Sequence, residues 1–378
     1  MGTGRASATG TWEGNGPDLQ WSTLEQDPAW DRFLEQAIGG HYTQTAAWAR
    51  YRSAFGWRSA RISASHGRRV VAGAQLLVRD VGPLGTVAYV DGGPVFTADG
   101  DDALPSVMHG LERLCRQQRV RYLVVRPSVS DRRLEGRLED WGLRPSERLA
   151  ARAAPATARV RLDRPPEAIL AGMRRSTRGN IRRGLSRGLT ARPASGAELP
   201  ALVHLYRRAA ERRGEGRPTG TRYERLWQAM AADGHAHLFL VEHAGEPVSA
   251  QLAIRFGETL YSHLMVWSGE HARHKPNELL EWTAMTWARE RGCRYYDFEG
   301  VDVAPGTDGA DRQRPSGDDS WGTDYKLGFG AEVVALAPYR ERFSNPVLRW
   351  GYDQVVRRTG WASSDVRTLR RVLPGRVR

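Results

Sequence analysis

Lysine and cysteine are almost absent from this sequence of 378 residues. The two cysteines, Cys115 and Cys293, lie far apart, and neither belongs to a CxxC or Cys/His spacing. That excludes a disulfide framework and a zinc motif built on cysteine. All basic residues except Lys275 and Lys326 are arginine, so each lysine is a candidate for a specific role.

Long apolar runs are also missing, since no segment approaches the ~18 apolar residues of a membrane span. Residues 1–16 are rich in glycine, serine and threonine and lack the apolar stretch of a signal peptide. We therefore expect a cytoplasmic protein with a disordered leader over residues 1–18. The remainder, with 40% hydrophobic residues in the whole chain, can fill the cores of two domains.

Acidic residues are in the minority, with 43 Asp and Glu against 56 Lys and Arg and a net charge of +13. A surplus of this size favours a polyanionic partner such as a nucleic acid, a nucleotide or an anionic membrane.

The hydrophobic periodicity predicts an α/β (α+β) fold in two blocks of mixed strands and helices. In each block a long helix, a short link and a strand follow one another, which suggests a duplicated unit. Residues 303–320 have the composition of a loop, and residues 346–358 that of a helix. The expected helices are 28–37, 45–55, 102–118, 134–141, 166–187, 196–213, 221–232 and 277–291. The expected strands are 59–65, 70–79, 86–90, 121–126, 158–162, 237–243, 247–256, 258–267 and 294–298.

The segment 321–332 places Lys326 between aromatic and glycine residues, directly after the expected loop. At the start of a strand, such a lysine can offer its charge to a developing oxyanion, a phosphate or a carboxylate, while the glycines permit close backbone approach. The alternative is an ordinary surface lysine beside a turn.

Arginines recur at helical spacing within the expected helix 166–187. An arginine face of this kind suits contacts with the phosphates of a nucleic acid, which position the ligand without reading its sequence. A solvated basic helix is the open alternative. The residues concerned are Arg174, Arg175, Arg178, Arg182 and Arg183.

Several familiar sites are missing: the sequence has no Ser/His/Asp elbow, Walker loop or HExxH motif. His263, His271 and His274 lie near a turn and could bind a ligand, but we expect no metal site. Residues 273–277 stand where acetyltransferases carry a glycine-rich pyrophosphate loop, and they lack the glycines, which argues against coenzyme A.

Five segments, in this order, resemble motifs of the Fem family of peptidyltransferases, which extend cell-wall precursors with amino acids from aminoacyl-tRNA. The resemblance covers roughly residues 20 to 360, in the compact form without a coiled-coil arm. The segments are residues 43–52, 89–95, 177–182, 296–301 and 325–330.

This resemblance implies two tandem acetyltransferase (GNAT)-like domains with mixed sheets flanked by helices. The first would comprise residues 19–155 plus about 335–378, and the second residues 156–334. It implies no cofactor, with aminoacyl-tRNA as co-substrate. The aminoacyl ester is already activated, so the enzyme need only position an amine, accept its proton and stabilise an oxyanion.

The resemblance also suggests roles for individual residues. Lys326 and Tyr325 match an aromatic–lysine pair that stabilises the tetrahedral intermediate, and Asp297, Glu299 or the substrate itself would accept the proton, unless Asp297 is a structural carboxylate. Arg213 or Arg222 could replace Arg217 in its phosphate contact. The implied acceptor-binding residues are Trp48, Arg52, Arg217, Tyr223 and Tyr261.

The implied acceptor is a cell-wall precursor (UDP-MurNAc-pentapeptide or lipid II) or the amine of a secondary metabolite in antibiotic biosynthesis. A lipid-linked acceptor would bring the protein into peripheral contact with a membrane. Two other functions remain open: an acyl-CoA-dependent N-acyltransferase on the same fold, and an inactive protein that binds tRNA or another nucleic acid.

Overall fold

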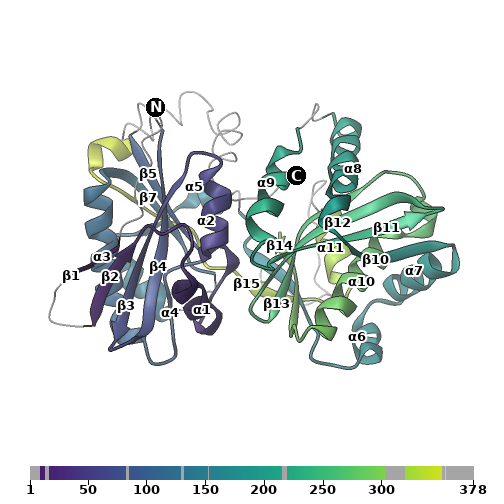
Figure 1. The fold of residues 1–378 in the computed structure, drawn as a ribbon, viewed down its shortest axis with the longest axis horizontal. Helices are drawn as coiled ribbons and strands as arrows, with labels where there is room; N and C mark the ends of the chain where they lie inside the picture. The colour runs from purple at the N-terminus through teal and green to yellow at the C-terminus, as the bar shows by residue number, and fades with distance from the viewer. Residues whose placement is uncertain are drawn as a thin grey trace. The chain divides into compact units, whose positions relative to one another are not determined.

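The computed structural model describes residues 9–12, 17–81, 85–128, 132–151, 153–214, 219–302, 320–350 and 354. The chain forms two compact units. The first comprises residues 1–153 and 337–378, and the second residues 154–336. Figure 1 shows the secondary structure of each.

The first unit is built on a nine-stranded mixed sheet with the order β1-β2-β3-β4-β5-β7-β16-β8 and with β6 paired to β4. Its strands are β1 (Thr9–Trp12), β2 (Asp18–Ser22), β3 (Arg58–His66), β4 (Arg69–Asp80), β5 (Thr86–Asp91), β6 (Val95–Phe96), β7 (Val120–Arg126), β8 (Arg144–Pro145) and β16 (Arg340–Phe343). Its helices are α1 (Pro28–Gln36), η1 (Tyr42–Gln44), α2 (Ala46–Ser53), η3 (Asp101–Ala103), α3 (Leu104–Gln117), α4 (Arg132–Asp140) and α5 (Glu147–Ala150).

Helix α3 supplies much of the first core. Its buried residues Leu104, Val107, Met108, Leu111 and Leu114 recur every three or four positions and therefore form one apolar face. That face packs on β3, β4 and β7. The helix also connects β5 to β7, and this crossover makes the two strands parallel.

The second unit contains a seven-stranded mixed sheet with the order β10-β11-β12-β13-β14-β9-β15. Its strands are β9 (Ala156–Arg161), β10 (Leu189–Ala194), β11 (Ala236–His243), β12 (Glu246–Phe256), β13 (Thr259–Trp267), β14 (Tyr295–Val301) and β15 (Glu332–Ala335). Its helices are α6 (Pro166–Gly172), α7 (Arg175–Ser186), η4 (Gly196–Glu198), α8 (Leu199–Arg212), α9 (Thr221–Met230), η5 (Ala272–His274), α10 (Pro276–Glu290) and α11 (Ser320–Leu327). Helices α7 and α10 pack together, and α10 covers β10 to β13.

The duplicated pattern predicted from the sequence is confirmed, because α3 leads into β7 and α10 into β14, and both strands pair in parallel with an earlier strand. Both units therefore have the predicted mixed sheet with flanking helices. The C-terminal strand β16 returns to the first sheet, where it pairs with β7.

Three predictions about local structure are wrong. Residues 9–12 of the expected disordered leader form β1, because Trp12 packs on the first core and beneath the guanidinium of Arg113 at 4.9 Å. The helix expected over 166–187 is broken at Met173 and Arg174, whose extended backbone lets the Arg174 N–H donate to Gly328 O at 2.9 Å.

The rest of the expected leader, residues 1–8 and 13–16, and most of the expected loop, residues 303–319, lie outside the described residues.

The third correction concerns Lys326, which lies in α11 and not at the start of a strand. Tyr325 and Phe329 are four positions apart and pack edge to face at 5.3 Å, a spacing that a helical turn brings together and a strand does not. Gly330, with φ of +74°, ends the turn before β15. The expected C-terminal helix is described only over residues 346–350 and at residue 354, all of them helical.

Candidate active site at the separated strands of the second unit

The parallel strands β13 and β14 separate along their length. They pair only at Thr259–Tyr295, Leu260–Tyr296 and Tyr261–Asp297. Beyond that point β13 stays with β12, while β14 continues along β9 with a bulge between Asp297 and Gly300. A bulge leaves residues out of the hydrogen-bond ladder and re-aims the strand, so the backbone of residues 298–300 is available for other contacts.

The side chain of Lys326 donates hydrogen bonds to the carbonyls of this backbone. Its Nζ lies 2.8 Å from Phe298 O, 3.1 Å from Glu299 O and 2.9 Å from Gly300 O. Three acceptors match the three hydrogens of an ammonium group, so the contacts favour the charged form. Because the acceptors are neutral carbonyls, they hold the positive charge at the separated strands without cancelling it.

A buried polar cluster lies on the α10 side of the strands. Glu281 is 1% exposed and accepts hydrogen bonds from Tyr296 Oη and from Gln251 Nε2 at 3.0 Å, and Ser262 Oγ lies at 3.5 Å. Burial raises the pKa of Glu281 to about 7, against the hydrogen bonds and the charge of Lys326, which lower it. This group is a carboxyl able to exchange a proton near neutral pH.

Sequence reasoning missed Glu281, although a signal was present. Glu281, Ala284, Met285 and Ala288 are spaced as one helical face, so the sequence places an acidic residue in an otherwise apolar stripe. A charged residue in such a stripe requires partners, and here Gln251 and Tyr296 from the sheet supply them.

His263 and Glu299 form a second pair. The register between β12 and β13 shifts between the pairs Leu252–Leu264 and Ile254–Tyr261, so His263 lies at a bulge of β13. His263 Nδ1 is 3.5 Å from Glu299 Oε1, and the two side chains are 11% and 33% exposed. Glu299 has φ of +55°, an uncommon backbone conformation for a residue other than glycine. The expected group of His263, His271 and His274 is thus wrong for His263.

Asp297 has structural partners for both of its oxygens. Oδ1 accepts from Thr157 Oγ1 and from Glu299 N at 2.7 Å, and Oδ2 accepts from Arg159 at 3.1 and 3.2 Å. Burial raises the pKa of Asp297, while Arg159 opposes the shift. These contacts fix the strand end, which is the structural role that the sequence left open beside a catalytic one, and the catalytic role of Asp297 stays a prediction. Tyr261, its pairing partner, is buried, and burial raises its pKa.

Tyr325 and Lys326 are neighbours on α11 but face different surroundings. The Tyr325 hydroxyl lies 4.0 Å from Met265 Sδ of β13, and burial raises the pKa of this phenol well above its usual value. The predicted pair is therefore placed between the two separated strands, with the phenol against β13 and the ammonium against β14.

The arginine face is smaller than predicted, because Arg174 precedes α7 and pairs with Asp324 at 2.8 Å. Arg178 Nη1 donates to Met173 O and to Ala171 O. The remaining three, Arg175, Arg182 and Arg183, are exposed on α7.

The residues predicted to bind the acceptor belong to both units. Trp48 and Arg52 lie on α2 of the first unit and are 1% and 4% exposed, and the Arg52 guanidinium is 5.1 Å from the ring centroid of Trp57. Tyr223 is buried on α9, where it packs edge to face on Tyr206 at 4.8 Å. Arg217 lies outside the described residues. Roles in acceptor binding stay predictions for these residues.

Comparisons with known proteins agree with this architecture. A family profile described as the acetyltransferase (GNAT) domain matches residues 171–325, and one described as the FemAB family matches residues 26–140. A lipid II:glycine glycyltransferase of Staphylococcus saprophyticus is 22% identical, covering 75% of this chain and 85% of that protein. One of Staphylococcus aureus is 21% identical, covering 74% and 84%.

Among solved structures, a crystal structure of FemX matches with a TM-score of 0.76 and 19% identity, covering 85% of this chain and 96% of that one. The chain therefore resembles Fem-family proteins in sequence. A tandem GNAT protein from the clavulanic acid biosynthesis pathway shares the fold of this chain at a TM-score of 0.52 and 14% identity, covering 87% and 99%.

The two profiles fall in different units of the chain. The FemAB profile covers α1 to α4 of the first unit, and the GNAT profile runs from α6 to Tyr325 and spans the separated strands. Among the described residues, no helix is long and apolar enough to cross a bilayer.

Proposed function

We propose that this protein transfers an aminoacyl group from aminoacyl-tRNA to the amine of a cell-wall precursor. This proposal rests on the separation of β13 and β14 beyond Tyr261 and Asp297, where the Lys326 ammonium is hydrogen-bonded to the freed carbonyls of β14. The relatives named as lipid II:glycine glycyltransferases support this acceptor class.

In the proposed reaction the amine nitrogen attacks the ester carbonyl carbon of the aminoacyl-tRNA. A C–N bond forms, the ester C–O bond breaks, and the terminal tRNA hydroxyl leaves with the proton that the amine has lost. The fixed charge of Lys326 stabilises the oxyanion of the tetrahedral intermediate. A charge already in place requires no reorganisation during the step, which makes it more effective than a mobile side chain.

His263 is the proton carrier of this proposal. Its Nδ1 lies 3.5 Å from Glu299 Oε1, and a carboxylate beside the ring stabilises the imidazolium that forms when His263 takes the proton from the attacking amine, before the proton passes to the leaving oxygen. Substitution His263→Gln should lower the transfer rate by roughly 10²-fold with tRNA affinity unchanged. An unaltered rate would indicate that a group of the substrate, and not His263, carries the proton.

The donor assignment rests on two features. In the loop before α10, where acetyltransferases bind pyrophosphate, the turn carries His274 and Lys275 instead of glycines and α10 begins at Pro276. Exposed Arg175, Arg182 and Arg183 on α7 supply charge suited to tRNA phosphates.

The deciding experiment incubates the full chain with radiolabelled aminoacyl-tRNA or acyl-CoA, and with lipid II, UDP-MurNAc-pentapeptide or a small amine as acceptor. We expect amide formation only with charged tRNA and a cell-wall precursor. Product from acyl-CoA alone would overturn the donor, and product with a small metabolite amine alone would overturn the acceptor. Binding of tRNA without any product would instead favour an inactive tRNA-binding protein.

A further inference from the structure

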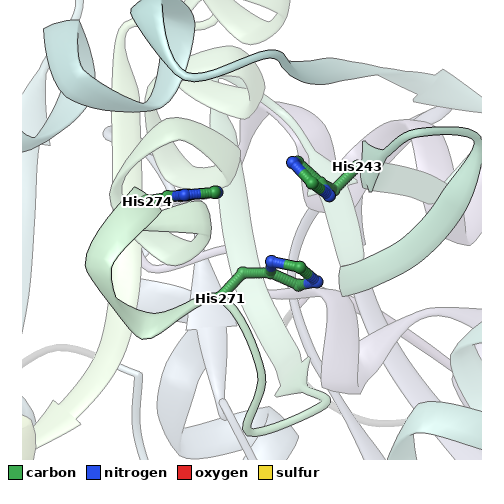
Figure 2. Close-up of side chains that lie close together, drawn as sticks. All are labelled: His243, His271 and His274. Carbon is green, nitrogen blue, oxygen red and sulfur yellow. The ribbon is translucent and has the colours of Figure 1, made fainter.

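Three histidines meet away from the separated strands. Figure 2 shows the imidazoles of His243, His271 and His274 facing one another. Each offers a ring nitrogen, and these nitrogens all lie within 4.8 Å of one another. Ring centroids are 4.3 Å apart for His243–His271, 5.1 Å for His243–His274 and 5.5 Å for His271–His274.

The backbone on both sides holds these rings in place. His243 ends β11 immediately before the tight turn into β12, and His271 and His274 bracket the single helical turn η5. The His274 N–H donates to His271 O at 2.8 Å, which fixes the spacing of these two residues. His271 and Lys275 have φ of +56° and +61°. Such strained residues persist only where the surroundings over-determine them, and they cluster at functional sites.

His274 gives the cluster an independent sign of a ligand. The residue is 8% exposed, and its Nδ1 is buried with no hydrogen-bond partner. A buried polar atom without a partner is costly, and a ligand at the centre of the three rings would satisfy it. Burial and the charges of His243, Arg273, His271 and Arg187 lower the pKa of His274.

A set of three converging imidazole nitrogens suits one class of ligand. A phosphate or other anion requires donors and would favour protonated rings, whereas a divalent transition metal binds the lone pair of a neutral ring. Arg187 and Arg273 lie nearby and repel a cation, so affinity is reduced but the ligand chemistry is not changed.

We propose that His243, His271 and His274 bind one divalent transition metal ion, zinc by preference, with solvent completing a tetrahedral site. Zn–N bonds of about 2.0–2.1 Å place ligand nitrogens about 3.4 Å apart in such a site. Ring rotations would therefore have to draw the nitrogens together by up to about 1.4 Å from the 4.8 Å limit.

The bound ion would join the β11–β12 turn to η5, which directly precedes α10. Because α10 carries Glu281, the ion would fix the start of the helix that builds one side of the candidate active site. This inference goes beyond the proposed function and does not depend on it, since the ion binds whichever acyl donor the protein uses.

The test uses the full chain without a polyhistidine tag. Titration with Zn²⁺ followed by calorimetry, and with Co²⁺ followed by visible ligand-field absorption, should give one ion per chain and tetrahedral cobalt spectra. The single substitutions His243→Asn, His271→Asn and His274→Asn should each weaken binding by at least ~10-fold. His204→Asn, which alters an exposed histidine on α8 of the same unit, should bind like the original chain.

A second measurement needs no variant. Zn²⁺ should protect His243, His271 and His274, but not His204, from diethyl pyrocarbonate modification mapped by mass spectrometry. Absence of zinc binding by the unmodified chain, equal binding by all variants, or uniform modification with and without zinc would each overturn the site.

Discussion

The two units contain the same helix–strand crossover, but their central parallel strands are joined differently. In the first unit β5 and β7 stay paired from Thr86–Val120 to Asp91–Arg126, and Gly92 N extends the ladder to Arg126 O at 2.7 Å. In the second unit β13 and β14 pair over three positions and then part. A closed ladder satisfies its own backbone groups, whereas the open one leaves the carbonyls of residues 298–300 to the Lys326 ammonium.

Side chains maintain each arrangement. Gln44 ties the end of β5 to β4, because its amide accepts from Gln75 N and donates to Asp91 O, each at 2.6 Å. In the second unit Lys326 donates to three carbonyls of β14 instead. A neutral amide thus joins the strands of the first sheet, whereas a cation lies where the strands of the second sheet separate. For this reason we propose that the aminoacyl transfer takes place in the second unit.

The largest effect is expected from Lys326→Met, which removes the charge from the open strands. Aminoacyl transfer should fall by roughly 10²–10³-fold, with tRNA affinity unchanged, in a single-turnover assay. Lys326→Arg should recover only part of the rate, because a planar guanidinium cannot serve three converging carbonyls in the same way. Lys275→Met, at the only other lysine of the sequence, should lower the transfer rate far less. An equal loss of rate in this variant would show that the position of the positive charge does not matter.

The substitution Glu281→Gln should remove a pH dependence of the free energy of unfolding that arises in the second unit. The folded pKa of about 7 lies above the ordinary value of 4.5, so stability from this group is complete below pH 4.5 and is lost as pH rises towards 7. At pH 8 the variant should be more stable by up to about 3 kcal/mol. Thermal unfolding between pH 4.5 and 8 measures this, and parallel curves for both proteins would contradict it.

The substitution Gln44→Leu should loosen the closed end of the first sheet. It leaves Gln75 N buried without this partner and removes one of the hydrogen bonds to Asp91 O, which still accepts from Thr43 Oγ1 at 2.9 Å, at a cost of about 1–3 kcal/mol. Amide hydrogen exchange should speed up in residues 86–91 and stay unchanged in β13 and β14. The exposed Gln20→Leu on β2 is the matched control and should change little; equal exchange in both variants would argue against the tie.

The smallest effect is expected from reversing two charges on α7. The double substitution Arg182→Glu and Arg183→Glu should weaken tRNA binding by roughly 10-fold and reduce the slope of its salt dependence by about 2. Arg68→Glu, at an exposed arginine of the first unit, is the control and should leave the slope as it is. Identical slopes for all three proteins in a salt titration would remove α7 from the tRNA-binding surface.

Much of the fold could be predicted because it is encoded locally. The apolar spacing of residues 102–118 and 277–291 indicated α3 and α10, and the glycine turns bounded the strands. Errors arose where distant contacts override local preference. Met173 and Arg174 break a helix because Gly328, far along the chain, accepts the Arg174 N–H.

For the site, the sequence by itself identified Lys326 and its aromatic neighbour, since a rare residue type stands out in any context. The folded structure was needed to show what the lysine contacts, which residues hold Asp297, and that His243 and not His263 lies with His271 and His274. The physical reason is separation along the chain. Periodicity reports which face of an element is buried, whereas hydrogen bonds and ligand sets depend on residues that only the folded sheet brings within a few ångströms.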